Sequence, residues 1–359
     1  MTPQATRRDR LRERMAAHDC TALLITDLSD VRYFCGFSGS NAAMVVTVDE
    51  ALLATDGRYV TQAGNEAPDV ELVVTRNLVV ELLMAVRDRG ISHVGFDAAA
   101  LTVAAWRRAG DDVPGIELLP VKVAASSLRQ VKDPAEIEAL TEACEISTRA
   151  LGRLLEDLRP GMPEIEIARR LELLMGLEGA PDRSFDSIVA GGPHSAIPHH
   201  QPTMRPIAAG DLLKIDFGAM YDGYHADCTR TFVVAAEPQD WQLQIHDVVA
   251  RAQQAGIDAL APGVLTSAVD RAARSVIEEA GLADFFGHGL GHGVGLDIHE
   301  VPFLGPTSPN TVEAGVPLTV EPGIYLPDRG GVRIEDTMLV LETGVQILTD
   351  FPRELTRVG

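Results

Sequence analysis

Cysteine is scarce in this sequence, and long apolar runs are absent. The 359 residues include four cysteines, and no two of them form a Cys-x-x-Cys pair. Without a disulfide framework, a reducing compartment is the default. No apolar run approaches the length of a membrane span, and residues 2–14 are charged where a signal peptide would be apolar. The sequence therefore predicts a cytoplasmic protein with no membrane partner.

Positive charge is also in short supply. There are 31 lysines and arginines against 52 aspartates and glutamates, which gives a formal net charge of −21. This balance argues against nucleic acid or an anionic membrane as partner, because either would need a basic face. The hydrophobic content of 46% is ordinary for a globular chain, and a length of 359 residues favours two domains.

The first predicted domain, residues 1–126, alternates strands with helices, as expected for an α/β fold. Its strands are predicted at 21–26, 43–48, 51–55, 70–75, 91–96 and 116–123, and its helices at 7–19, 57–62, 78–89 and 99–109. The second predicted domain, residues 127–359, opens with a long helix over 134–158 that has proline at its first position.

The chain is organised around residues 212–232. Asp222-Gly223 is a strong signal for a hairpin turn between two largely apolar strands. Pairing across this turn places Asp216 opposite Thr229, so that Asp216 and Asp227 are diagonal neighbours roughly 7–8 Å apart. Two carboxylates that close repel each other unless positive charge lies between them. For this segment alone, two solvated aspartates on an edge hairpin are an equal alternative.

The hairpin belongs to an internal repeat of about a hundred residues, too long for a solenoid. Asp216-Phe-Gly218 corresponds to Glu321-Pro-Gly323, and a second arm over 332–340 carries Glu335. A turn near Asp328 would place Glu321 and Glu335 opposite each other. Each half is predicted as a helix, a Pro-Gly break, a second helix and a strand pair. A pseudo-two-fold axis between the halves would bring four carboxylates together.

Residues 286–300 alternate glycine with histidine, leucine or valine, which indicates extended backbone. His288 and His292 have the spacing of a helical zinc pair, but the glycines argue against a helix. A glycine-rich loop with solvent-facing histidines is the alternative. His288, His292 and His299 lie beside the repeated carboxylates, which favours a site. His199 and His200 end another stretch rich in glycine and proline and are weak signals alone.

Four carboxylates and one imidazole suit a pair of divalent metal ions. Asp216, Asp227, Glu321 and Glu335 balance four positive charges, and a neutral histidine supplies a fifth ligand. Oxygen ligands with one imidazole and no thiolate suit Mn, Co, Zn or Fe(II). Two such ions activate a bridging water and polarise a carbonyl, while further histidines can donate hydrogen bonds to an oxyanion.

Several motifs resemble the pita-bread metallopeptidases, in particular the proline-specific branch of aminopeptidase P and prolidase. They are Asp216-Phe-Gly218, Asp227-Cys-Thr-Arg230, His288-Gly-Leu-Gly-His292, Glu321-Pro-Gly323 and Arg333-Ile-Glu-Asp336. Residues 30–40 and 55–59 resemble the N-terminal domain of those enzymes and of creatinase. The resemblance covers nearly the whole chain. It implies an α/β N-terminal domain followed by an α+β pita-bread domain with an internal pseudo-two-fold duplication.

The resemblance also implies roles for individual residues. The metal ligands would be Asp216, Asp227, His292, Glu321 and Glu335, with Asp227 and Glu335 bridging two divalent ions, for which manganese is expected. Glu321 would also shuttle a proton for the attacking water. His199, His288 and His299 match histidines that contact the substrate and stabilise the tetrahedral intermediate, and Arg333 matches an arginine behind the ligands. His200 is additional to the pattern. The family further implies a homodimer.

The expected reaction is hydrolysis of the bond between an N-terminal residue and proline in a dipeptide or short peptide. An Xaa-Pro dipeptidase (prolidase) is favoured, because the chain resembles the short bacterial members most. Aminopeptidase P, acting on longer peptides, is the close alternative. A creatinase-like amidinohydrolase and a non-catalytic binding protein are further alternatives, and the intact ligand set disfavours both.

The loop over residues 36–41 bears on substrate length. It is small and polar apart from Phe37. Phe37 could pack on its own domain. Alternatively, since the family forms dimers, the loop could reach the partner's cleft and exclude peptides longer than a dipeptide.

Overall fold

The structure, a computed structural model, describes residues 2–16, 20–121 and 125–359. The chain divides into two compact units, Met1–Arg129 and Gln130–Gly359. The division falls three residues beyond the predicted boundary at 126/127. Helix α6 (Ala125–Arg129) belongs to the first unit, because Arg129 forms a buried ion pair with Asp30 (2.8 Å) and the Tyr33 hydroxyl donates to the Leu128 carbonyl (2.9 Å).

The first unit is built on one mixed sheet of six strands in the order β4-β3-β2-β1-β5-β6. Strands β1, β2 and β3 pair antiparallel, and the outer pairs are parallel. The strands are β1 (Ala22–Ile25), β2 (Ala42–Thr47), β3 (Ala51–Thr55), β4 (Glu71–Val74), β5 (His93–Phe96) and β6 (Glu117–Pro120). The helices are α1 (Pro3–Met15), α2 (Leu28–Cys35), α3 (Val60–Glu66), α4 (Leu78–Asp88), α5 (Val103–Asp112) and α6. The predicted strands lie where the sequence placed them, although residues 122 and 123 of the last one are outside the described residues.

Phe37 packs on its own unit. Its side chain is 1% exposed and meets the Tyr59 ring edge to face, with 5.7 Å between ring centroids. The following residue, Ser38, donates from its amide and its hydroxyl to the Glu66 carboxylate (2.8 and 2.9 Å). The expectation that Phe37 could pack on its own domain is therefore confirmed, and a reach of the loop into a partner's cleft stays a prediction.

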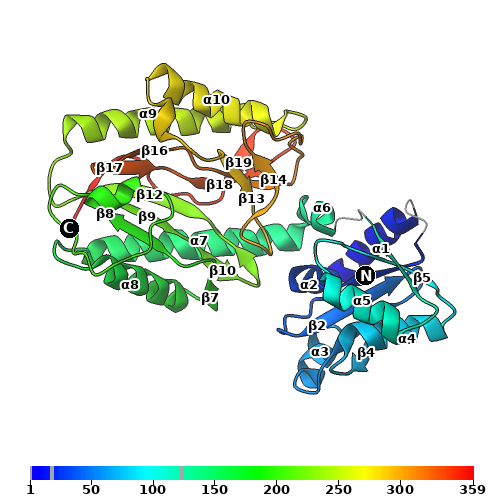
Figure 1. Ribbon diagram of the computed structural model, residues 1–359. Helices are drawn as coiled ribbons and strands as arrows, with labels where there is room; N and C mark the ends of the chain where they lie inside the picture. Colours follow the sequence, from blue (N-terminus) through cyan, green and yellow to red (C-terminus); the bar gives the residue numbers. More distant parts are fainter. Residues whose placement is uncertain (1, 17–19, 122–124) are drawn as a thin grey trace. The chain divides into compact units, whose positions relative to one another are not determined.

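The second unit contains the predicted duplication. One half has helices α7 (Pro134–Asp157) and α8 (Glu164–Leu177), and the other has α9 (Asp240–Ala259) and α10 (Thr266–Glu279). Each helix pair is joined by a Pro-Gly break whose glycine has positive φ, 93° at Gly161 and 85° at Gly263. Such backbone strongly favours glycine. In Figure 1 the strands of this unit lie between the two helix pairs.

The strands of the second unit form two principal sheets. One has the order β20-β12-β9-β8 and the other β14-β13-β15-β18-β19, with smaller groups β11-β10-β7 and β16-β17. The first half supplies β7 (Asp182–Arg183), β8 (Ile188–Gly191), β9 (Leu212–Phe217), β10 (Ala219–Tyr221), β11 (Tyr224–His225) and β12 (Cys228–Val234). The second half supplies β13 (Gly291–Gly293), β14 (Glu300–Leu304), β15 (Pro317–Val320), β16 (Gly323–Leu326), β17 (Gly330–Arg333), β18 (Asp336–Val340), β19 (Val345–Ile347) and β20 (Arg357–Val358). Two short 3₁₀ helices, η2 (Gly192–Ala196) and η3 (Ala283–Phe285), complete the unit.

The central hairpin has the predicted register. Tyr221 pairs with Tyr224 across Asp222-Gly223, and Asp216 pairs with Thr229. Both turn residues have positive φ, 45° and 77°, as the tight hairpin turn requires. The position of the turn therefore fixes which face each carboxylate occupies.

The second hairpin also agrees with the prediction. Val320 pairs with Asp336, and Gly323 pairs with Arg333. Glu321 and Glu335 lie between these two paired positions, and so face each other. An isolated bridge joins Thr229 of the first half to Glu335 of the second, with the Glu335 amide donating to the Thr229 carbonyl at 3.1 Å.

Two separate apolar cores stabilise this unit, one under α7 and α8 and one under α9 and α10. Within the described residues, no helix is both long enough and apolar enough to cross a membrane. All four cysteines are buried, and no disulfide joins any of them.

Candidate metal centre

The structure brings the five predicted ligands together. Asp216 lies on β9, Asp227 just before β12, His292 on β13, Glu321 just after β15 and Glu335 just before β18. All five line one cavity of about 270 Å³. Residues far apart in sequence therefore meet where the two halves of the duplication face each other.

His292 has one nitrogen directed at the carboxylates. Its Nδ1 donates to the Gly293 carbonyl (2.9 Å), which leaves Nε2 unprotonated in the neutral ring. Nε2 lies 3.5 Å from Asp227 Oδ2 and 3.6 Å from Glu321 Oε1. Ligand atoms of Asp227, His292 and Glu335 all lie within 4.8 Å of one another. One ion could contact all three.

Asp216 and Glu335 are each held by a partner on one oxygen. Asp216 Oδ2 accepts from Arg333 Nη2, and Glu335 Oε2 accepts from the Thr229 hydroxyl (2.6 Å). Asp216 Oδ1 is buried without a hydrogen-bond partner. A buried carboxylate oxygen in that state is costly, and a cation in the cavity would satisfy it.

The electrostatics also fit bound cations. Burial, together with the neighbouring carboxylates, raises the pKa values of Asp227 and Glu335 well above the usual range for a carboxyl group. Burial and the charge of Asp216 raise the pKa of Glu321 to about 8. Burial lowers the pKa of His292 to about 4, so its ring is neutral and able to ligate at neutral pH. Divalent ions would replace the protons that these carboxylates otherwise retain, and the residues present therefore fit such ions.

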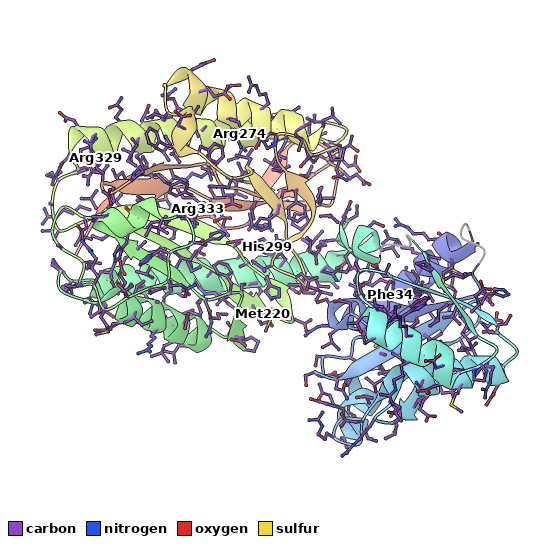
Figure 2. All side chains as sticks on the ribbon, viewed as in Figure 1. Phe34, Met220, Arg274, His299, Arg329 and Arg333 are labelled. Carbon is purple, nitrogen blue, oxygen red and sulfur yellow. The ribbon has the colours of Figure 1, made fainter. Side chains whose placement is uncertain are left out.

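Arg333 connects Asp216 to the loop that carries His199. Its side chain is buried and donates to Asp216, to the Thr229 hydroxyl (3.0 Å), to the Tyr325 hydroxyl (2.9 Å) and to the Pro198 carbonyl (3.2 Å). In Figure 2 Arg333 is labelled among the strands of the second unit, between the two helix pairs. The guanidinium thus fixes the orientation of Asp216 while reaching the loop that carries His199.

The three predicted substrate histidines surround a neighbouring cavity of about 390 Å³, which shares His292, Glu321 and Arg333 with the first. His199 and His299 are exposed side chains that line both cavities. The His299 ring meets the His292 ring nearly perpendicular, with 4.5 Å between centroids.

His288 is engaged on both ring nitrogens. Nδ1 donates to the Gly289 carbonyl (2.8 Å), so Nε2 accepts from the Tyr325 hydroxyl (3.0 Å). Burial lowers the pKa of His288 to about 4, which keeps the ring neutral at physiological pH. His288 can donate to a substrate oxygen only after its Nε2 gains a proton and releases Tyr325.

Two residues at this site were not singled out in the sequence analysis. Tyr325, four residues after Glu321, bridges His288 and Arg333 through its hydroxyl. Lys214 is completely buried on β9, two residues before Asp216. Strand β9 is apolar from Leu212 up to Asp216 except for Lys214. This exception could have identified Lys214 from the sequence. His200, additional to the family pattern, lies buried against Glu164 (2.9 Å).

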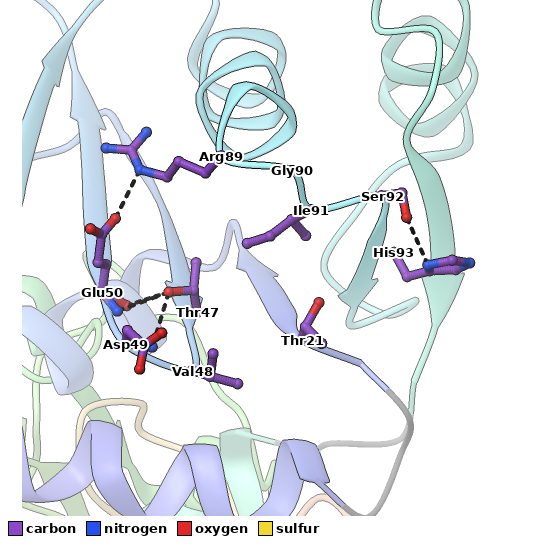
Figure 3. A pocket seen from close by; sticks show the side chains of 10 residues that line it. All are labelled: Thr21, Thr47, Val48, Asp49, Glu50, Arg89, Gly90, Ile91, Ser92 and His93. Carbon is purple, nitrogen blue, oxygen red and sulfur yellow. Dashed lines mark hydrogen bonds and ion pairs between the residues drawn. The ribbon is translucent and has the colours of Figure 1, made fainter.

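A separate cavity of about 570 Å³ lies in the first unit. Arg89 reaches across its wall and donates to Glu50 (2.8 Å) and to Glu71 (2.6 Å), and Figure 3 shows the contact with Glu50. These charges pair with one another. The convergent carboxylates and histidines of the second unit are the better candidate for a functional site.

Comparison with known proteins supports this choice. Residues 138–342 match metallopeptidase family M24, and residues 7–131 match the creatinase/prolidase N-terminal domain. An uncharacterised peptidase of Bacillus subtilis is 37% identical over 348 residues, which cover 97% of this chain and 98% of the relative.

Two solved structures are similar over almost their full length. An Xaa-Pro dipeptidase from Bacillus anthracis superposes with a TM-score of 0.95 at 36% identity, covering 99% of this chain and 100% of its own. An X-Pro aminopeptidase from Thermotoga maritima superposes with a TM-score of 0.92 at 35% identity, covering 98% and 99%. These matches confirm the predicted fold class, an α/β N-terminal domain followed by a pita-bread domain.

Proposed function

The chain belongs to metallopeptidase family M24, and on that premise we propose that it hydrolyses the peptide bond between an N-terminal residue and proline. The observation that carries the proposal is the group of four carboxylates, three of them buried and Glu321 partly buried, and one neutral imidazole around a single cavity. The relatives named as Xaa-Pro peptidases support the substrate class.

Two divalent ions fit this group, and we propose Asp216, Asp227, His292, Glu321 and Glu335 as their ligands, with Asp227 and Glu335 shared. Manganese is the proposed ion, because oxygen-rich ligation without thiolate suits it. When bound, the ions lower the pKa of a water and polarise the scissile carbonyl.

The protein groups supply positioning and proton transfer. Glu321 has an oxygen on the cavity and, as the proton shuttle, would accept a proton from the attacking water and deliver it to the proline nitrogen. Arg333 holds Asp216 in place. His199 and His299 line the cavities and can donate to substrate oxygens. His288 could join them in the tautomer that carries the ring proton on Nε2, once its contacts to the Tyr325 hydroxyl and the Gly289 carbonyl are released.

The alternatives without metal chemistry lose support. A creatinase-like amidinohydrolase would not need five convergent ligands, and a binding protein would not need a carboxylate such as Asp216 with one buried oxygen left without a partner. Burying these carboxylates costs free energy, and neither alternative function gives a reason for that cost.

We propose an Xaa-Pro dipeptidase as the first candidate, in agreement with the sequence motifs, and aminopeptidase P as the second. The second candidate stays because an X-Pro aminopeptidase superposes almost as well as a dipeptidase, with TM-scores of 0.92 and 0.95. The burial of Phe37 removes one feature that could have blocked longer peptides. We also propose that the chain acts in the cytoplasm as a homodimer.

The test is hydrolysis of Ala-Pro, Ala-Pro-Ala and Ala-Ala by the manganese-loaded protein. The proposal expects kcat/KM for Ala-Pro to exceed both others. Comparable or faster cleavage of Ala-Pro-Ala identifies an aminopeptidase P. Equal cleavage of Ala-Ala would show that the protein is not specific for proline.

A further inference from the structure

Lys214 is a buried basic side chain to which the proposed reaction gives no role. Its side chain is 0% exposed, and its Nζ donates to the carbonyls of Ile197 (2.6 Å) and Pro198 (3.1 Å). The ammonium also lies 5.0 Å from the centroid of the Tyr325 ring. Burying an ammonium group is costly unless hydrogen bonds compensate. Here both acceptors are main-chain carbonyls of one loop, so this lysine serves that loop.

The loop in question, residues 191–203, carries His199 and will be called the His199 loop. The two carbonyls that Lys214 binds belong to the residues immediately before His199. Arg333 Nη1 donates to one of them, the Pro198 carbonyl, at 3.2 Å. Two buried basic side chains therefore donate to the backbone that leads into His199.

A buried anion holds the rest of the same loop. Glu164, the first residue of α8, is 0% exposed. One of its oxygens accepts from the Gly191 amide and from His194 Nδ1, both at 2.8 Å. The other accepts from His200 Nε2 (2.9 Å) and from the amide and hydroxyl of Thr203 (3.1 and 2.7 Å). These contacts fasten the loop on both sides of His199, and a helix N-terminus favours the anion.

Glu164, His194 and His200 could instead hold a metal ion, since a carboxylate and two imidazoles can form a zinc site. The geometry favours hydrogen bonds. Each imidazole nitrogen lies at hydrogen-bond distance from a different carboxylate oxygen, and both oxygens already accept from the main chain.

We propose that Lys214 and Glu164 are positioning residues that together hold His199 at the metal centre. The proposal rests on the proposed function in one respect, namely that His199 contacts the substrate. Lys214 on β9 donates to carbonyls of the loop, and Glu164 on α8 accepts from its amides and side chains, so the loop is held from two elements. A displacement of about 1 Å in such a group can slow catalysis about 10²-fold, which sets the scale of the expected effect.

The first experiment is a double-mutant cycle between Lys214→Met and His199→Ala, in which the parent, the two single variants and the double variant are all loaded with manganese. Lys214→Met should lower kcat for Ala-Pro about 10- to 100-fold, with bound metal unchanged. If Lys214 acts through His199, the same substitution in the His199→Ala background should cost less than about 3-fold. Leu212→Met, on the same strand, is the matched control and should stay close to the parent.

The second experiment measures amide hydrogen exchange and needs no substrate. Lys214→Met should accelerate exchange in residues 193–203 and leave the helices α7 to α10 protected, whereas Leu212→Met should change neither. A parent that cleaves no Xaa-Pro peptide would refute the proposed function, and hydrogen exchange would still decide whether Lys214 holds the loop.

Three results would overturn the inference. One is parent-like exchange in the His199 loop of Lys214→Met. Another is an equal loss of kcat from Lys214→Met in both backgrounds, which would indicate a general structural role. The third is an additional bound metal ion in the parent that is lost in His200→Asn. It would show that Glu164 ligates a metal ion and does not accept the hydrogen bonds that hold the loop.

Discussion

The crowding of carboxylates at the metal centre makes a specific prediction about stability and pH. In metal-free protein the free energy of unfolding should fall as pH rises from 6.5 to 8. The folded-state pKa of Glu321 is about 8, far above the ordinary value of 4.5. The unfolded state has released the Glu321 proton throughout the window, whereas the folded state retains nearly all of it at pH 6.5 and about half of it at pH 8. Stability linked to that proton is present at low pH and is lost as pH rises.

The size of the effect follows from linkage. One proton retained only in the folded state changes the free energy of unfolding by about 1.4 kcal/mol per pH unit. Asp227 and Glu335, whose pKa values are raised in the same direction, add to the loss. His288 and His292 have the opposite effect on the free energy of unfolding, and only below about pH 6.5. The pKa of His288 and of His292 is lowered from 6.5 to about 4, so their contribution grows up to about pH 6.5 and is then constant.

Manganese should reverse the trend. An ion that binds only the folded site adds about 2.7 kcal/mol at a concentration of 100 Kd. Its affinity increases with pH because the ligands must lose their protons. With saturating manganese, stability should therefore be level or increasing between pH 6.5 and 8.

The assay is urea unfolding followed by circular dichroism at several pH values, with metal content checked by elemental analysis. Glu321→Gln should flatten the metal-free slope, while Glu279→Gln, at an exposed position outside the site, should keep it. Metal-free protein whose stability is constant or rising across this window would show that the carboxylates do not share a buried, repulsive site.

Three further predictions concern single side chains. His292→Ala should lower bound metal, whereas His288→Ala should keep the metal and lower kcat by about 10²–10³-fold, as measured by elemental analysis and steady-state kinetics; the reverse pattern would exchange their roles. Tyr325→Phe removes the hydroxyl that His288 Nε2 accepts from, and should lower kcat about 10-fold with metal content unchanged, a barrier increase of about 1.4 kcal/mol; parent-like turnover would exclude Tyr325 from the mechanism. Ser147→Ala leaves the buried Ala219 amide without its 2.8 Å acceptor and should lower the free energy of unfolding by about 1–3 kcal/mol, and an unchanged urea midpoint would contradict this.

The carboxylate hairpins could be predicted because local chemistry determines them. Asp222-Gly223 favours the positive φ of a two-residue turn, and the turn sets which residues pair. Once the register is fixed, the face of Asp216 follows from the two-residue period of a strand. The duplication then extends the same reasoning to Glu321 and Glu335.

The groups behind the ligands could not be predicted in this way. Lys214 and Tyr325 act through partners distant in sequence, such as the Pro198 carbonyl and His288, and no local period specifies those contacts. Phe37 shows the same limit, because whether a loop phenylalanine projects or packs depends on Tyr59, which lies 22 residues later.

Metal dependence of Xaa-Pro hydrolysis tests the central claim most directly. The protein would be stripped with a chelator, its metal content measured, and its hydrolysis of Ala-Pro followed before and after adding manganese. The account predicts two bound ions per chain in the active protein, loss of hydrolysis when they are removed, and recovery on their return. Undiminished hydrolysis of Ala-Pro by protein shown to be metal-free would contradict it.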